Sequence, residues 1–333
     1  MHNASTFSPL LDLLNTQARS RLQAMPFSAN YLYHFLAIWL SLVLVSVGAN
    51  AEPIPLAKLA EINSLQPTGS NAPPSDTTPL TITIVNPATT DPDDPATYYE
   101  KLLKLALEKT RTSHGSFVIK HKPNADGVGR VRAMLVANNG FDVIWSSVTA
   151  EREAAMRVVP FNLLRGLNDY RILLVHQTRQ DNFNVVKNLS DLRQFSAGSG
   201  QHWHDTHVLR ANNINVTTSI AYEALFKMLA ADRFDFIACG MHEIDFAVKT
   251  FGPLGLSIEP TLLLHYKTPT NYSFFVNKDN QKLADRILLG LQLAQQDGSF
   301  EQVFNEFSHF KQRYSEINNT NRVNIEIVNP NDR

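Results

Sequence analysis

The stretch that decides the fold is residues 135–144 (LVANNGFDVI), because it occurs a second time, 93 residues later, as residues 228–237 (MLAADRFDFI). Each copy reads as the end of an amphipathic helix, a tight turn and a buried strand. Two such helix–strand units predict two similar lobes rather than one continuous sheet. The copies then diverge, the first into WSSVTAER (145–152) and the second into ACG (238–240). Since the residues after each strand line the space between facing lobes, we expect the function to lie in this asymmetry.

The composition is that of a globular protein large enough for two lobes. The chain has 333 residues, of which 44% are apolar and 18% are charged. A net charge of −1 argues against a nucleic-acid partner, which requires a basic face. Cys239 is the one cysteine of the sequence, so no intrachain disulfide is possible. Its place at the end of an apolar strand predicts a buried, inert thiol.

The first fifty residues predict export. Residues 31–47 are almost wholly apolar and are followed by Ala-Asn-Ala (49–51), the small-residue pattern of a signal-peptidase site, with two arginines upstream. We therefore assign residues 1–51 to a cleaved signal peptide. An uncleaved membrane anchor is the alternative, because a run of 17 residues is near the lower limit for a spanning helix. Residues 52–79 are rich in proline and read as a linker.

From residue 80 onward, strands and helices alternate. The first strands are expected at 80–85, 116–121 and 141–147, with helices at 95–109 and 128–138 between them. This order implies a mainly parallel sheet with covering helices. The later strands are expected at 171–176, 214–217, 234–239, 262–266 and 272–276, and the later helices at 202–211, 222–231, 241–251 and 279–296. Residues 318–333 are rich in asparagine and are expected to form a flexible tail.

Several short motifs follow one another in the order of a known family. They are FDVIWSS (141–147), Thr149 with Arg152 three residues later, VPF (159–161) and DGSF (297–300). On these motifs the chain resembles, over most of its length, the family-3 solute-binding proteins of bacterial ABC transporters, the amino-acid-binding branch. The resemblance implies an α/β, two-lobed type II periplasmic-binding-protein fold. Each lobe would have a mainly parallel sheet covered by helices, and two crossing strands would join the lobes.

The resemblance also implies domain boundaries and a way of working. Lobe 1 would comprise residues 80–168 and 271–317, lobe 2 residues 169–270, and the crossings would lie near 167–171 and 266–272. A ligand would bind in the cleft and the lobes would close over it, which requires only a few linker residues to change conformation. The implied protein is periplasmic and monomeric, has no enzymatic activity and no cofactor, and has a small molecule and an inner-membrane ABC permease as partners.

Arg152 is the first candidate ligand-binding residue. Thr149 can cap a helix whose first turn holds Arg152, so that backbone N–H groups and a guanidinium converge. The planar fork of arginine fits a carboxylate through two parallel hydrogen bonds, which lysine does not reproduce. In the resembled family the matching arginine binds the ligand α-carboxylate with serines of the preceding strand end, which implies Arg152 with Ser146, Ser147 and Thr149. From position alone, the alternative is a solvated arginine on a surface helix.

A second group of candidates comes from the other half of the chain. Ser199, Gly200 and Gln201 lie between a short strand and a helix, where glycine lets backbone N–H groups approach a ligand. In the resembled family this loop is the second lobe's main ligand contact; the alternative is an ordinary strand-to-helix turn. Trp203 and Trp145 are candidates to pack on the ligand, although core packing is the commoner role of aromatic residues.

The second cassette departs from the family pattern. The resemblance implies an acid just past its strand that holds the ligand ammonium group, but Gly240 occupies the matching position. Glu243 or Asp245 would have to substitute from the next helical turn, and the alternative is that both are exposed helix charges. An α-amino acid is therefore one candidate ligand, and another carboxylate or anion is a second.

The segment HWHDTH (202–207) has the composition of a metal site, with three imidazoles and a carboxylate. On a helix His204 and His207 share a face, while His202 and His204 do not. The segment also lacks the helix spacing of metalloproteases. We therefore favour cleft lining over metal binding for this segment.

Three functions follow from these observations. The first is a solute-binding protein that captures a small, polar, carboxylate-bearing and amino-acid-like ligand for an ABC transporter. The second is a periplasmic dehydratase on the same fold, which requires a general acid or base; Glu243, His202 and His242 are the candidates. The third is a ligand-sensing module, which an uncleaved N-terminal segment would favour.

Overall fold

The computed structural model describes residues 78–86, 91–123, 127–317 and 321–330. All of them belong to one compact unit, Asn71–Arg333. The predicted signal peptide and nearly all of the predicted linker lie outside the described residues. Of the helices in the described ranges, none is long and apolar enough to cross a membrane.

The first group of strands carries the first cassette. β1 (Leu80–Val85) pairs in parallel with β2 (Phe117–Lys122). β11 (Tyr272–Val276) lies antiparallel between β3 (Val143–Ser147) and β4 (Arg157–Val158). β11 therefore comes from a part of the sequence more than 100 residues beyond its two neighbours.

The second sheet has seven strands and carries the second cassette. Its order is β12-β10-β5-β8-β6-β7, and β9 also pairs with β5. The strands are β5 (Tyr170–His176), β6 (Ser196–Gly200), β7 (Asn215–Ser219), β8 (Phe236–Gly240), β9 (Leu256–Ile258), β10 (Leu262–Tyr266) and β12 (Val323–Ile327). All but β12 come from one continuous part of the chain.

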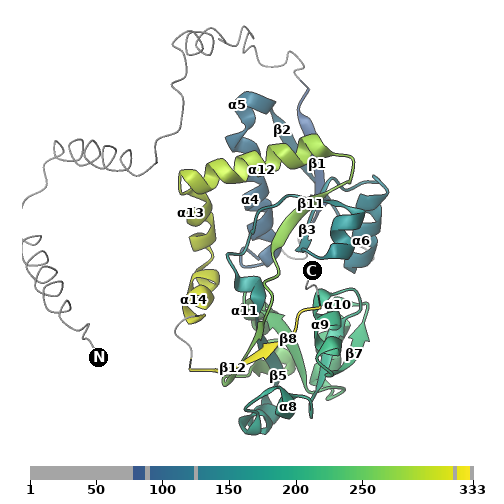
Figure 1. Ribbon diagram of the computed structural model, residues 1–333, viewed down its shortest axis with the longest axis vertical. Helices are drawn as coiled ribbons and strands as arrows, with labels where there is room; N and C mark the ends of the chain where they lie inside the picture. Colours follow the sequence, from purple (N-terminus) through teal and green to yellow (C-terminus); the bar gives the residue numbers. More distant parts are fainter. Residues whose placement is uncertain (1–77, 87–90, 124–126, 318–320, 331–333) are drawn as a thin grey trace, which may run out of the picture. The chain divides into compact units, whose positions relative to one another are not determined.

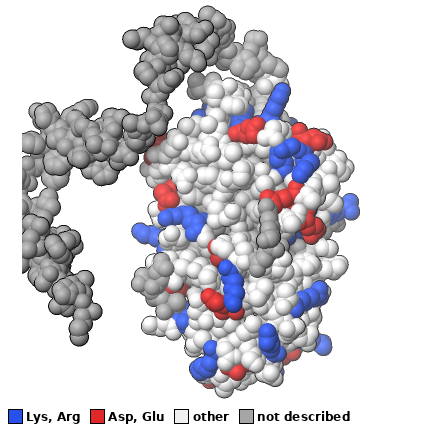
Figure 2. Space-filling view, viewed as in Figure 1, with Lys and Arg blue, Asp and Glu red and all other residues white. Residues whose placement is uncertain are grey.

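Helices cover both groups of strands (Figure 1). The helices that precede β5 or follow β11 in the sequence are α4 (Pro95–Lys109), α5 (Arg111–His114), α6 (Gly127–Val136), α7 (Ala150–Ala155), α12 (Gln281–Gln296), α13 (Ser299–Glu306) and α14 (Ser308–Glu316). The others are α8 (Leu189–Leu192), α9 (His204–Ala211), α10 (Tyr222–Ala230) and α11 (Ile244–Phe251), with short 3-10 helices η2 (Leu167–Asp169), η3 (Gln177–Val185) and η4 (Gly252–Leu254). On the face drawn in Figure 2, acidic and basic side chains are interspersed.

The helices begin and pack where the sequence requires. Asp94 caps α4 by accepting a hydrogen bond of 2.9 Å from Ala96 N, with Pro95 at the first helical position. α4 packs against α12 so closely that Gly290 has no room for a side chain, since a Cβ there would lie 2.0 Å from Ala106 O. This contact fixes α12 on the same layer as α4.

The predicted α/β architecture is confirmed, with mixed rather than mainly parallel pairing. β11 is antiparallel to both of its neighbours, and β5 is antiparallel to β8, β9 and β10. β5 and β11 each begin directly after a segment where the chain passes between the two groups of strands. A strand–helix–strand unit requires its two strands to be parallel. A strand that follows a crossing is not part of such a unit, so β5 and β11 can pair antiparallel.

The prediction of a flexible tail at 318–333 was wrong for residues 323–327. These residues form β12, a parallel edge strand on β10 in which Val323 pairs with Leu262. Ile325 and Ile327 are buried while the residues between them are exposed, which is the alternation of a half-buried strand. The asparagines around this short alternation favoured a tail over a strand at the sequence level.

The two cassettes hold their sheets in the same way. Asp142 N donates to Thr83 O at 2.9 Å, and the Asp142 carboxylate accepts from Thr83 N at 2.7 Å. In the second copy, Asp235 N donates to Ser196 O at 2.9 Å, and the Asp235 carboxylate accepts from Ser196 N at 2.8 Å. The repeated Phe-Asp pair therefore fastens each cassette strand to its neighbour, which explains why the aspartate occurs in both copies.

Replacing Asp142 with alanine should lower the free energy of unfolding by about 1–2 kcal/mol, because Thr83 N loses its acceptor. Urea denaturation measures the loss. Asp142→Asn is the matched control, since it keeps an oxygen at the same place and should cost less. Equal stability of the alanine variant and the unchanged protein would contradict this role for Asp142.

Candidate ligand-binding site

The end of the first cassette places Arg152 inside the protein. Thr149 is in an extended conformation and caps α7, and its hydroxyl accepts a hydrogen bond of 3.2 Å from Arg152 N. The Arg152 side chain turns back so that Nη1 donates to Ser147 O at 2.7 Å. Arg152 is only 6% exposed. It is therefore not the solvated surface arginine that its position in the sequence also allowed.

Arg152 reaches the second sheet through the backbone of His202. Its Nη2 donates to His202 O at 3.4 Å, and Nη2 of Arg132 donates to the same oxygen at 3.3 Å. Within the described ranges neither arginine forms an ion pair with a carboxylate. Burial, together with the neighbouring charge of Arg132, lowers the pKa of Arg152 to about 10.

Aromatic rings form a wall beside Arg152. The ring of Tyr99 stacks between Trp145, at 5.3 Å, and Tyr272, at 5.2 Å. His242 contacts the other side of Tyr272, with ring centroids 5.6 Å apart. Trp145 and Ser147 share one face of β3, and strand alternation puts Ser146 on the opposite face.

Two buried polar atoms on this wall have no hydrogen-bond partner in the described part of the chain. They are the Tyr99 hydroxyl and His242 Nδ1, on residues that are 2% and 5% exposed. An unsatisfied buried polar atom costs roughly 1–3 kcal/mol. Both atoms belong to rings that contact Tyr272, so a bound ligand or water at this wall would remove the cost.

Glu243 is the acid that follows the second cassette. Its Oε1 accepts from Gly240 N at 2.9 Å, and its side chain keeps 41% of its surface exposed. Partial loss of hydration around the carboxylate raises the pKa of this half-exposed Glu243. Asp245 instead turns to α14, where it forms an ion pair of 2.6 Å with Arg313. Of the two predicted substitutes for the missing acid, only Glu243 therefore lies beside Gly240.

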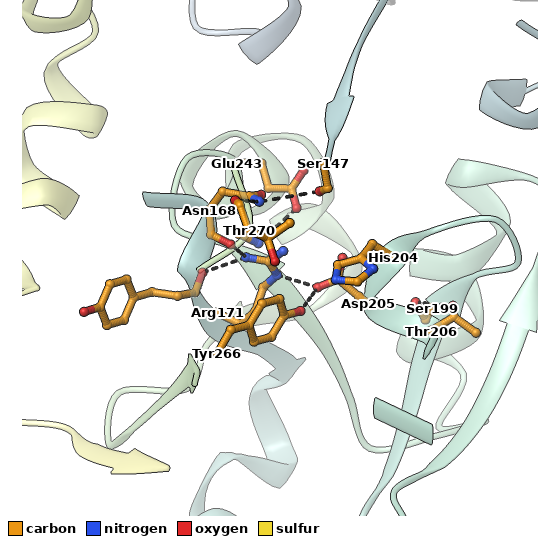
Figure 3. Close-up of polar contacts among 12 residues, drawn as sticks. Ser147, Asn168, Arg171, Ser199, His204, Asp205, Thr206, Glu243, Tyr266 and Thr270 are labelled. Carbon is orange, nitrogen blue, oxygen red and sulfur yellow. Dashed lines mark hydrogen bonds and ion pairs between the residues drawn. The ribbon is translucent and has the colours of Figure 1, made fainter. Parts of the chain in front are cut away.

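Arg171 forms the centre of a buried polar network (Figure 3). Its Nε forms an ion pair with Asp205, and the Tyr266 hydroxyl donates to the same carboxylate oxygen. Its Nη1 donates to Asn168 O at 2.7 Å. Arg171 is 2% exposed. Its charge keeps the pKa of Asp205 below the usual range, and Asp205 raises the pKa of Arg171.

The two chain crossings are bonded to each other beside this network. Asn168 Nδ2 donates to Thr270 O at 2.8 Å, and Thr270 N donates to Asp169 Oδ1 at 2.6 Å. Asn168 Nδ2 also reaches the Ser147 hydroxyl, 3.5 Å away. The crossings are thus tied to the end of β3, from which Arg152 is positioned.

The loop predicted from Ser199 to Gln201 is the end of β6 and the turn after it. Thr206 Oγ1 donates to Ser199 Oγ at 2.8 Å, so the buried Ser199 hydroxyl is bonded within the protein. The Trp203 ring lies so close to Gly200 that a Cβ there would be 2.4 Å from it. Gly200, Gln201 and Trp203 line a cavity of about 60 Å³ that faces Gly127–Arg130 of α6.

The histidine segment is divided between interior and surface. His204 is buried, and its Nε2 lies 3.0 Å from Asn329 Oδ1, while His202 and His207 are exposed. Within the described ranges, no group of three or more His, Cys, Asp or Glu residues is arranged to hold a metal ion. Cys239 is buried, and burial raises the pKa of its thiol, so it is not poised as a nucleophile.

The fold is that of periplasmic binding proteins, as three solved structures of low sequence identity show. An arginine-specific periplasmic binding protein of Salmonella typhimurium matches with a TM-score of 0.52 at 14% identity, covering 68% of this chain and 98% of that one. An ancestral amino-acid-binding protein, described as a precursor of cyclohexadienyl dehydratase, matches at 0.51 with 13% identity, covering 68% and 94%. A histidine kinase sensor domain with similarity to periplasmic binding proteins matches at 0.50 with 12% identity, covering 69% and 95%. No family model matches the sequence, and no curated protein matches it.

Sequence reasoning missed three features of the site. Arg132 belongs to no recognised motif, and only the folding of the chain brings its side chain to the His202 carbonyl. The ion pair of Arg171 and Asp205 joins residues 34 positions apart. In the sequence, Asp205 attracts attention only as part of the histidine segment at 202–207. Tyr272 lies where the predicted crossing at 266–272 meets the apolar strand at 272–276, and no motif marks it as a site residue. An aromatic residue at the start of a strand that follows a crossing was the one available signal.

Two buried histidines should make stability depend on pH below neutrality. Burial lowers the pKa of His204 to about 4 and that of His242 to about 3, whereas an unfolded histidine titrates near pH 6.5. Between about pH 6.5 and 4 the unfolded chain therefore takes up protons that the folded protein does not. The free energy of unfolding should therefore decrease as the pH is lowered through this range. The decrease should be up to about 1.4 kcal/mol per pH unit for each imidazole.

Urea denaturation at several pH values from 7 to 4.5 measures this slope. His242→Gln should flatten it, while His207→Gln, at an exposed position, should leave it unchanged. A slope that is the same in all three proteins would rule out His242 as its source.

Proposed function

We propose that this protein binds a small, polar, carboxylate-bearing ligand as a periplasmic solute-binding protein does, with Arg152 as the carboxylate-binding residue. The observation that carries the proposal is the state of Arg152: it is 6% exposed, and its guanidinium donates to the carbonyl oxygens of Ser147 and His202 alone among described residues. A buried guanidinium without a counter-ion is unfavourable. A ligand carboxylate would supply the charge and accept the remaining N–H donors.

The surroundings of Arg152 suit an amino-acid-like ligand. Trp145, which stacks on Tyr99 through one face of its ring, offers apolar surface, and Glu243 supplies a carboxylate for an ammonium group. Ser147 and Thr149 lie beside Arg152, and Gly200 and Gln201 directly precede His202, whose carbonyl oxygen Arg152 contacts. The amino-acid-binding proteins of similar fold support this choice.

The proposed mechanism is closure of two lobes over the ligand. We assign residues 80–168 and 271–317 to the first lobe and residues 169–270 to the second. The bonded crossings at Asn168 and Thr270 would serve as the hinge. Transfer to an inner-membrane ABC permease and a periplasmic location complete the proposal, in keeping with the predicted signal peptide.

Arg152→Gln should abolish binding of the best ligand in a calorimetric screen of amino acids and small carboxylic acids. Two charge-assisted hydrogen bonds are lost, so affinity should fall at least roughly a hundredfold. Arg111→Gln is the control. The Arg111 side chain is 61% exposed, and Arg111 lies on α5, far from Arg152 in the sequence. Unchanged affinity in Arg152→Gln would refute the proposed carboxylate contact.

A dehydratase is the second candidate, favoured by one observation. Glu243 has a raised pKa and lies beside His242, whose Nδ1 has no partner among described residues. A carboxylic acid with a raised pKa is suited to general acid or base catalysis. Purified protein should then convert an arogenate-like substrate, and Glu243→Gln should stop the reaction while binding persists. If the unchanged protein gives no product, the binding role alone stands.

A further inference from the structure

We propose that the ligand is a compact dicarboxylate, with one carboxylate bound by Arg152 and the other by Arg132; this inference rests on the proposed function. Two guanidinium groups meet at one point of the protein. Nη2 of Arg132 and Nη2 of Arg152 lie 3.3 Å and 3.4 Å from the carbonyl oxygen of His202. They come from different helices, α6 and α7, and the fold alone brings them together.

The charges of these two arginines are not neutralised by the described part of the chain. Neither forms an ion pair there, and Glu151 acts on both from beyond ion-pair distance. Arg132 donates one side-chain hydrogen bond and Arg152 two, although each guanidinium carries five N–H donors. Most of their donors are therefore free to bind a ligand.

Other buried arginines of this protein are treated differently. Arg171 is paired with Asp205, and Arg313 with Asp245 and Glu316. Arg286 has no acidic partner, but it donates to Thr110 Oγ1 and to three backbone carbonyls, those of His114, Gly115 and Leu107. A buried arginine in this chain thus receives either a carboxylate or a full set of acceptors. Arg152 receives neither, and the half-buried Arg132 beside it donates to the same carbonyl oxygen.

Two adjacent cations in a partly buried site repel each other, and burial weakens the charged form of both. A single carboxylate would balance one of them. Two planar forks on separate helices fit two planar carboxylates, one for each fork. Of the nearby acids, Asp205 is already engaged, Glu243 accepts from Gly240 N, and Glu151 acts on both arginines without forming an ion pair with either.

The geometry also limits the size of the ligand. Because both Nη2 atoms contact the same oxygen, the two carboxylates must be only a few bonds apart. His202 also lines a cavity of about 60 Å³ together with Gly127–Arg130 and Gly200–Trp203; neither Arg132 nor Arg152 lines this cavity, so the limit on ligand size comes from the shared carbonyl oxygen. The ligand would take the place of the His202 carbonyl, which now accepts from both arginines.

Calorimetry with two matched pairs tests the inference: glutamate against glutamine, and succinate against succinamate. Each pair differs in one carboxylate, and only the first pair has an ammonium group. In at least one pair the dicarboxylate should bind about tenfold tighter or more, as one charge-assisted contact predicts. Arg132→Gln should remove this preference and leave the affinity for the monocarboxylate. Arg210→Gln, an exposed arginine on α9, should change neither.

The outcomes separate this inference from the proposed function. Equal affinities within both pairs, or a preference that persists in Arg132→Gln, would overturn the dicarboxylate while binding that depends on Arg152 stands. Tighter binding of inorganic phosphate than of either dicarboxylate would overturn it in favour of a tetrahedral anion. If no member of either pair binds, and Arg152→Gln behaves as the unchanged protein does with other carboxylic acids, both proposals are wrong.

Discussion

The buried ion pair of Arg171 and Asp205 is the interaction on which the rest of the structure depends. It joins the start of β5, just past the first crossing, to α9, and the Tyr266 hydroxyl at the end of β10 donates to the same carboxylate. One charged group thus holds both crossings and the helix that follows His202. Loss of either partner of such a pair leaves the other charge buried and uncompensated, which costs about 3–5 kcal/mol. Because Asp205 is committed to Arg171, it is not available to Arg152.

The two cassettes share the residue that stabilises the fold and differ in the residues that follow their strands. Both copies fasten their strands through an aspartate, at Asp142 and Asp235, so their shared residues serve the fold. Beyond the strand, the first copy turns a guanidinium inward at Arg152, while the second ends in Gly240, where the His242 ring of the aromatic wall lies close to the backbone. A Cβ at Gly240 would lie 2.5 Å from the His242 ring, so a larger residue there would displace the aromatic wall. The missing acid is therefore a consequence of packing as well as of ligand choice.

The elements were predictable because their signals are local. The alternation at Leu80–Val85 and the capped start of α4 at Asp94 depend on neighbouring residues only, and the structure has both where the sequence places them. β12 was missed because its alternation covers only five residues and stands among asparagines, which favoured a tail. In the candidate site, the place of Arg152 behind the Thr149 cap was predictable from its motif, whereas Arg132 contacts a carbonyl 70 residues away. A side chain whose one described partner is a backbone atom far away in the sequence leaves no pattern that the sequence could reveal.

The His202 carbonyl has two opposing effects on any ligand that uses Arg152. It keeps the guanidinium oriented toward the second sheet, so less side-chain entropy is lost when a carboxylate arrives. The His202 carbonyl also competes with the ligand for the N–H donors of Arg152. Displacing it lowers the observed affinity, as in any protein whose free form is not fully competent to bind. A neutral carbonyl is a weaker acceptor for a guanidinium than a carboxylate is. On the proposed function, the exchange would favour charged ligands over neutral ones, so the contact that orients Arg152 would also contribute to selectivity.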